Sequence, residues 1–136
     1  MSAVKQKPRT GTVPEDGTSV LKTWPAPPDV KEVELTSDEV TVMCPKLGNP
    51  DFYTVRVRYR PRGRVVCTKA LKEWFVSQRQ EGYSCELFAQ AIYRLLRETI
   101  DPVWLTVTVA QRARGGIGLT ATCRGLGPSN PYERQA

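Results

Sequence analysis

Cys44 and Asp51 stand seven positions apart, on either side of the turn Gly48-Asn49-Pro50. A thiolate is a natural nucleophile for an electrophilic carbon, and a neighbouring carboxylic acid can give a proton to the atom that gains negative charge. Because a tight turn can fold one group back toward the other, the pair is a candidate for covalent catalysis. On spacing alone, a simpler interpretation competes with it, in which Cys44 is a small core residue and Asp51 a turn former.

The composition limits the other kinds of site. The chain of 136 residues carries a formal charge of +6, four dispersed cysteines and no histidine. A zinc site would therefore have few ligands, and in a reducing compartment the cysteines are expected to be thiols. No run of about 18 apolar residues occurs, and the N-terminus lacks the apolar centre of a signal peptide, so we expect a cytoplasmic protein.

The basic charge is spread along a strand rather than gathered in a tail. Arg56, Arg58 and Arg60 alternate with apolar residues, which is the period of a strand with one solvated face. The simplest interpretation is a solvated strand face, and a polyanionic partner is the alternative.

Hydrophobic periodicity and turn residues divide the rest of the chain. Residues 1–28 are rich in proline, glycine and charge and are predicted to form a flexible arm, and residues 29–136 a single domain. Strands are expected within 30–44 and over 53–59, followed by helices over 68–80 and from an N-cap at Ser84 to about Thr99. Two more strands are expected over 103–111 and 117–123, joined at Gly115-Gly116.

The order of two strands, two helices and two strands predicts an α+β fold. Both helices should cover one face of a four-stranded antiparallel sheet, so that something else must cover the other face. The sheet would leave its edge strands unpaired, and pairing them between subunits into a closed barrel is one solution. We therefore expect a homo-oligomer.

Four segments resemble one family. "CPKLGNPDFYTVRVRY" resembles the Cys-Pro-x-x-Gly-x-Pro-Asp-Phe signature of the NADPH-dependent 7-cyano-7-deazaguanine reductases, the nitrile reductases of queuosine biosynthesis in tRNA modification. "VVCTKALKEWF", "CELF" and "RARGGIGL" agree with later family segments in order and spacing, so that the resemblance covers about residues 30–119. It implies the tunnelling fold, in which subunits join their sheets into barrels and active sites lie at subunit interfaces.

The resemblance also implies roles for individual residues. Cys44 would attack the nitrile carbon to form a thioimidate, and Asp51 would donate the proton. Glu86 would bind the donor N–H edge of the deazapurine. Matching family positions add a set of substrate-binding residues and a set of cofactor-binding residues that contact NADPH phosphates. The first set is Val66, Cys67, Thr68 and Cys85, and the second is Lys69, Lys72 and Arg114.

This chain departs from the family pattern at several positions. Cys85 replaces the histidine that precedes the family glutamate, and Cys67 and Thr68 replace the glutamate and serine of the segment tied to NADPH. Glu73 follows Lys72 where the family commonly has leucine or tyrosine.

Two other functions compete with the reductase. An archaeal branch that resembles this family adds ammonia to the nitrile of a modified tRNA and forms an amidine without NADPH. Such an enzyme would keep Cys44, Asp51 and Glu86, and a basic surface would suit tRNA. The segments "KALK" and "RGGI" favour the reductase. A non-catalytic binding module would leave the pairing of Cys44 with Asp51 without a purpose.

Overall fold

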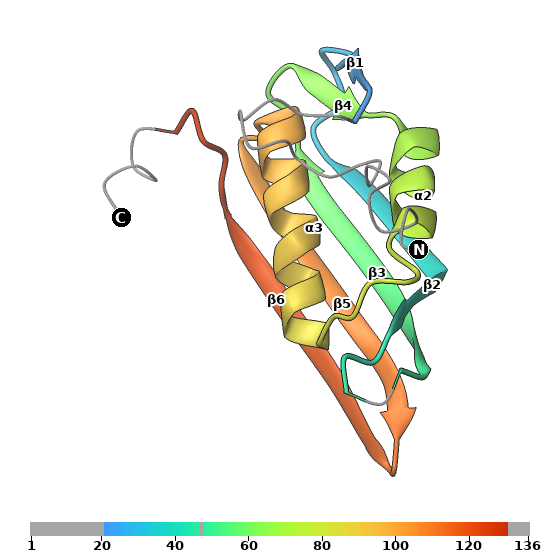
Figure 1. Cartoon of the computed structure of the whole chain (residues 1–136). Coiled ribbons are helices and arrows are strands. Elements are labelled where there is room, and N and C mark those ends of the chain that lie inside the picture. Colours follow the sequence, from blue (N-terminus) through green and yellow to red (C-terminus); the bar gives the residue numbers. More distant parts are fainter. Residues whose placement is uncertain (1–20, 47, 131–136) are drawn as a thin grey trace.

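The computed structural model describes residues 21–46 and 48–130, and a four-stranded antiparallel sheet lies at its centre (Figure 1). The strands follow one another across the sheet in the order β2 (Val33–Met43), β3 (Pro50–Arg60), β5 (Trp104–Arg114) and β6 (Ile117–Leu126). Two helices, α2 (Thr68–Ser77) and α3 (Cys85–Ile100), cover one face. The predicted order of strands and helices and the α+β class are confirmed.

A second, smaller sheet was not predicted. β1 (Thr23–Pro25) pairs antiparallel with β4 (Arg64–Val66), directly before α2. The boundary predicted at residue 28 is therefore wrong for the described residues, because 23–25 are hydrogen-bonded into the folded domain. The rest of the predicted arm, residues 1–20, lies outside the described residues.

β3 shows most clearly how the sequence builds the core. Its residues alternate between exposed and buried along the whole strand. Val55, Val57 and Tyr59 face the helices and are at most 2% exposed, whereas the arginines between them face away. The period-two pattern of the sequence thus decides which side of β3 joins the core.

The two helices begin and end where local signals place them. Ser84 is the N-cap of α3, and its Oγ accepts a hydrogen bond from the backbone N–H of Leu87 at 3.2 Å, as its residue type predicts. α3 ends at Ile100, and its C-cap Asp101 adopts the left-handed conformation with φ 44°. α2 is shorter than the predicted 68–80, because its last turn passes into the loop before α3. Neither described helix is long and apolar enough to cross a membrane.

The face of the sheet opposite the helices is polar, and no described helix covers it. Arg56 pairs with Glu34 at 3.3 Å, and Arg58 pairs with Glu32 at 2.7 Å. The side-chain hydroxyl oxygens of Thr108 on β5 and Thr122 on β6 lie 3.4 Å apart. These pairs fit a solvated strand face and neutralise part of its charge.

Two one-residue irregularities interrupt the sheet. Between Ser37 and Val40, β2 uses one more residue than β3 does opposite it. Between Gln111 and Arg114, β5 likewise uses one more residue than β6. A bulge of this kind moves every later side chain of its strand to the other face of the sheet.

Candidate active site

Cys44 follows the last residue of β2, in a loop held by backbone hydrogen bonds. The N–H of Cys44 donates to Asn49 O at 2.6 Å, and its carbonyl accepts from the N–H of Gly48 at 3.0 Å. Gly48 has φ 75°, a conformation that favours glycine. The loop therefore folds back, and β3 begins at Pro50 beside the end of β2.

The loop between the helices supports the same segment. Met43 forms backbone hydrogen bonds with Glu81 and Tyr83, at 3.0 and 3.2 Å. Gly82 lies against Pro45, since a Cβ atom on Gly82 would be 3.2 Å from the Pro45 Cα. These contacts fix the start of α3 next to Cys44.

Asp51 is the second residue of β3 and is only 3% exposed. It pairs in register with Val42, which is fully buried on the side of the sheet that carries the helices. A buried carboxylate needs a charged or hydrogen-bonding partner. Arg114 supplies it, because its Nη1 donates a short hydrogen bond to Asp51 Oδ1.

Arg114 also interacts with the thiol. A hydrogen bond to the Cys44 side chain, followed by the charge of Asp51, raises the pKa of Arg114 above its usual value. The structure thus brings three groups together at one end of the sheet: Cys44, Asp51 and Arg114. The resemblance assigned Arg114 to the cofactor, and its contact with Asp51 was not predicted.

Tyr53 and Cys85 lie next to the group of Cys44, Asp51 and Arg114. Burial, and secondarily the charge of Asp51, raises the pKa of Tyr53, whose hydroxyl donates to Gln111 Oε1 at 3.5 Å. The Cys85 thiol donates to Val109 O at 3.5 Å, and burial raises its pKa as well. Sequence reasoning missed Tyr53, although the strand period places it on the same face as Asp51.

Glu86 is exposed in the first turn of α3, next to buried Cys85. A carboxylate is favourable there because the N-terminus of a helix carries partial positive charge. Since the loop before α3 packs on Pro45, Glu86 lies at the same end of the domain as Cys44. Its carboxylate is open to solvent and offers only acceptors.

The remaining predicted residues lie at the opposite end of the domain (Figure 1). Val66 ends β4, and Cys67 is the N-cap of α2, with its backbone N–H donating to Lys22 O at 2.9 Å. Thr68, Lys69 and Lys72 follow in the first turns of α2. One chain therefore does not bring these residues to Cys44.

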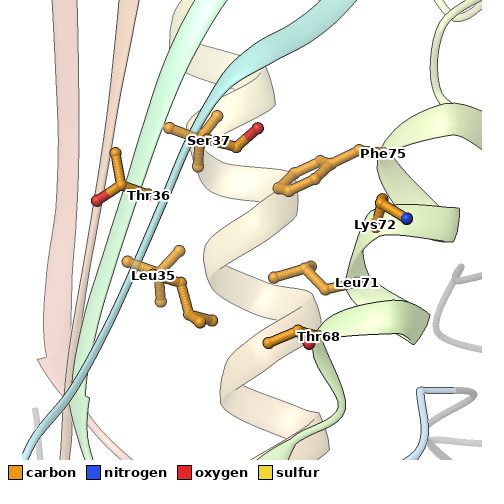
Figure 2. A pocket seen from close by; sticks show the side chains of 9 residues that line it. Leu35, Thr36, Ser37, Thr68, Leu71, Lys72 and Phe75 are labelled. Carbon is orange, nitrogen blue, oxygen red and sulfur yellow. The ribbon is translucent and has the colours of Figure 1, made fainter.

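A cavity of about 240 Å³ lies between α2 and the strands β2 and β3. Figure 2 shows Leu71 and Phe75 of α2 pointing toward Leu35 and Ser37 of β2. Thr68 and Lys72 also line this cavity, so two of the predicted binding residues border an apolar opening. No group of three or more potential metal ligands occurs among the described residues.

Comparisons with known proteins agree with this architecture. A crystal structure titled as that of the archaeosine synthase QueF-Like in the apo form superimposes with a TM-score of 0.67 and 22% identity. The match covers 76% of this chain and 99% of that structure. At this identity the similarity shows the fold alone, and the fold is the tunnelling fold that the resemblance implied.

Sequence relatives define the family more closely. The family model described as "QueF-like protein" matches residues 50–128. A protein of Frankia casuarinae is 40% identical over 116 residues, which cover 85% of this chain and 87% of that protein. A protein of Thermomicrobium roseum is 37% identical and covers 82% of each chain. Both are named NADPH-dependent 7-cyano-7-deazaguanine reductase. The chain belongs to the QueF-like family.

The pKa shifts of the cysteines predict their order of reactivity. Hydrogen bonding from the backbone of Ala70 lowers the pKa of the Cys67 thiol, whereas burial raises the pKa of Cys123 and Cys85. A lowered pKa gives more thiolate at a given pH, so Cys67 should be alkylated by iodoacetamide at lower pH than Cys123. Cys85 should stay unmodified in the folded protein. Peptide mass spectrometry over a pH series measures this order, and faster reaction of Cys123 than of Cys67 would contradict it.

Proposed function

We propose that this chain is an NADPH-dependent reductase that converts the nitrile of 7-cyano-7-deazaguanine into the aminomethyl group of 7-aminomethyl-7-deazaguanine. The observation that carries the proposal is the contact of one arginine, Arg114, with both a thiol, Cys44, and a buried carboxylate, Asp51. Relatives of up to 40% identity that are named as this reductase support it. We expect the enzyme to act in the cytoplasm, where a reducing environment keeps Cys44 a thiol.

The chemistry begins at Cys44. Its sulfur adds to the nitrile carbon as the S–H bond breaks, and Asp51 passes the thiol proton to the nitrile nitrogen, which gives a thioimidate on the enzyme. Asp51 suits this role because it is buried, excluded from bulk water, and contacted by the same arginine as the thiol. Covalent attachment also holds the substrate in place for the reduction that follows.

Glu86 orients the deazapurine. Its exposed carboxylate accepts hydrogen bonds from the N–H groups of a guanine-like ring, which present only donors at that edge. Cys85 cannot replace the family histidine as a ring contact, since its thiol is buried and bonded to Val109 O. Ring recognition therefore depends more heavily on Glu86 than in relatives that carry the histidine.

The start of α2 fits a cofactor that carries phosphates. Lys69 and Lys72 lie in the first turns of the helix, and no acidic residue occurs in its first turn. The helix N-terminus adds positive partial charge and N–H donors for anions. NADPH supplies the hydride, two for each nitrile. Val66, Cys67 and Thr68 would line the neighbouring part of the pocket.

A complete site needs a second subunit in this proposal. The lysines of α2 and the Cys44 loop lie at opposite ends of one chain, and the outer strands β2 and β6 have unpaired edges within the described chain. A homo-oligomer that joins these edges into a barrel would place α2 of one subunit near Cys44 of another.

The first test is catalytic turnover. Purified protein with the nitrile base and NADPH should oxidise two NADPH molecules for each nitrile consumed, which the loss of nicotinamide absorbance measures. Cys44→Ala should abolish turnover, whereas Cys123→Ala, which removes a thiol of β6 outside the site, should retain it. If NADPH is not oxidised while ammonium converts a nitrile-bearing tRNA into an amidine, the ammonia-adding function replaces the reductase.

The covalent step can be tested without the cofactor. The nitrile base alone should raise the intact mass of the protein by the mass of one substrate molecule, because addition of the Cys44 thiol to the nitrile loses no atom. The mass gain should disappear in Cys44→Ala and persist in Cys123→Ala. An adduct that maps to Cys67, or no adduct at all, would refute the assignment of Cys44 as the nucleophile.

The shared site can be tested by mixing inactive subunits. Cys44→Ala and the double variant Lys69→Gln/Lys72→Gln should each be inactive as pure oligomers. Co-expressed in equal amounts, they should recover about a quarter of wild-type activity, because random assembly of symmetric oligomers pairs an intact Cys44 loop with an intact α2 in that fraction of sites. Absence of any recovery in verified mixed oligomers would place both functions within one chain.

A further inference from the structure

A β-bulge in β5, in which the strand gains one residue relative to β6, turns Arg114 toward Asp51. Gln111 pairs with Leu119, and Arg114 pairs with Ile117, so three steps along β5 match two steps along β6. Leu119 packs against the core, and Ile117, two residues before it, lies on the same face of β6. In an uninterrupted strand, Arg114 would point to the face opposite that of Gln111. The bulge therefore sends a guanidinium to the side where Asp51 is buried.

The hairpin turn that follows Arg114 fixes the position of this arginine. Gly115 and Gly116 connect β5 to β6 with φ 59° and 83°, and two successive positive φ values are the requirement of a tight turn of this kind. Arg112, two residues earlier, shows the contrast. It lies above the ring of Phe52, 5.1 Å from the centroid, and Phe52 is adjacent to Asp51 but exposed on the other face. Two arginines of one strand thus serve opposite faces.

We propose that Arg114 is a positioning residue, which holds the Asp51 side chain and aims it at Cys44, so that Asp51 carries the proton of the thiol to the nitrile nitrogen. The inference rests on the proposed function for the substrate, but the contacts of Arg114 are independent of it. The S–H bond breaks as the S–C bond forms, and the N–H bond forms as C≡N becomes C=N. Asp51 begins and ends as a carboxylate, so no other acid is consumed.

The surroundings support this assignment. The other titratable groups near the pair are Tyr53 on β3, Cys85 and Glu86 at the start of α3, and Lys46 in the same loop as Cys44. Burial keeps Tyr53 and Cys85 neutral near neutral pH, since it raises the pKa of both. Arg114 is the cation whose contacts with both Cys44 and Asp51 are observed, and its planar fork of donors can bind two acceptors at once.

The test measures the reactivity of Cys44 without nitrile or NADPH, so it can fail while the proposed function stands. In Arg114→Gln, alkylation of Cys44 by iodoacetamide should slow about tenfold at neutral pH, and its pH profile should shift upward by about one unit, because the thiolate loses its cation. Arg114→Lys should restore part of the rate, since a point charge replaces the fork. Cys123, a thiol of β6 outside the site, serves as the reference thiol in every sample and should not change.

Arg112→Gln is the matched control, with the same charge removed from the same strand but from the other face. It should leave the Cys44 profile unchanged. An unchanged profile in Arg114→Gln, or an equal shift in Arg112→Gln, would overturn the proposal. Alkylation of Cys85 reports loss of structure. If Cys85 becomes reactive in Arg114→Gln, that variant has lost structure and Arg114→Lys is used instead. A Cys44 alkylation rate in Arg114→Lys equal to that of wild type would likewise overturn the proposal.

Discussion

The site depends on which face of the sheet each side chain occupies. Alternation along a strand is strict, so a shift of one residue moves every later side chain to the other face. β2 and β5 each contain one extra residue, and both lie before the part of the strand that leads into the site. The extra residue in β2 places Val42 opposite Asp51 on the buried face, and the chain reaches Cys44 two residues later. The extra residue in β5 brings Arg114 to the same face.

The burial of Asp51 then requires its pairing with Arg114. Asp51 is almost inaccessible to solvent, and an isolated buried carboxylate would cost several kcal/mol if it stayed charged. Arg114 offsets part of this cost, and its contact ties the tip of the β5–β6 hairpin to the start of β3. The same contact also brings a cation to Cys44. One side chain, that of Arg114, therefore meets two requirements: it pairs a buried acid, which stability needs, and it holds that acid together with a thiol, which the chemistry needs.

The sequence predicts the regular parts of this architecture well and the irregular parts poorly. The period of residues 55–60 and the N-cap Ser84 are local signals, and the structure contains both features. β1 and β4 are three residues long, too short for a period to be visible, and they exist because they pair with each other. The bulge before Arg114 is also invisible in the sequence, and simple alternation would place this arginine on the wrong face. The Cys44 and Asp51 pair was found through its motif, whereas its arginine required the structure.

Position in the fold also decides what Cys85 and Cys67, the two cysteines that depart from the family pattern, can do. Cys85 is buried against β5 and β6, where a thiol is a small hydrophobic group, so a cysteine in place of the histidine expected from the family resemblance leaves the packing satisfied. Cys67 occupies the N-cap of α2, where the N–H groups of the first turn favour a thiolate over a neutral thiol. A glutamate at that position would carry the same sign of charge. A group that can carry negative charge therefore remains at the start of α2, but a thiol, unlike a carboxylate, can also lose that charge by oxidation.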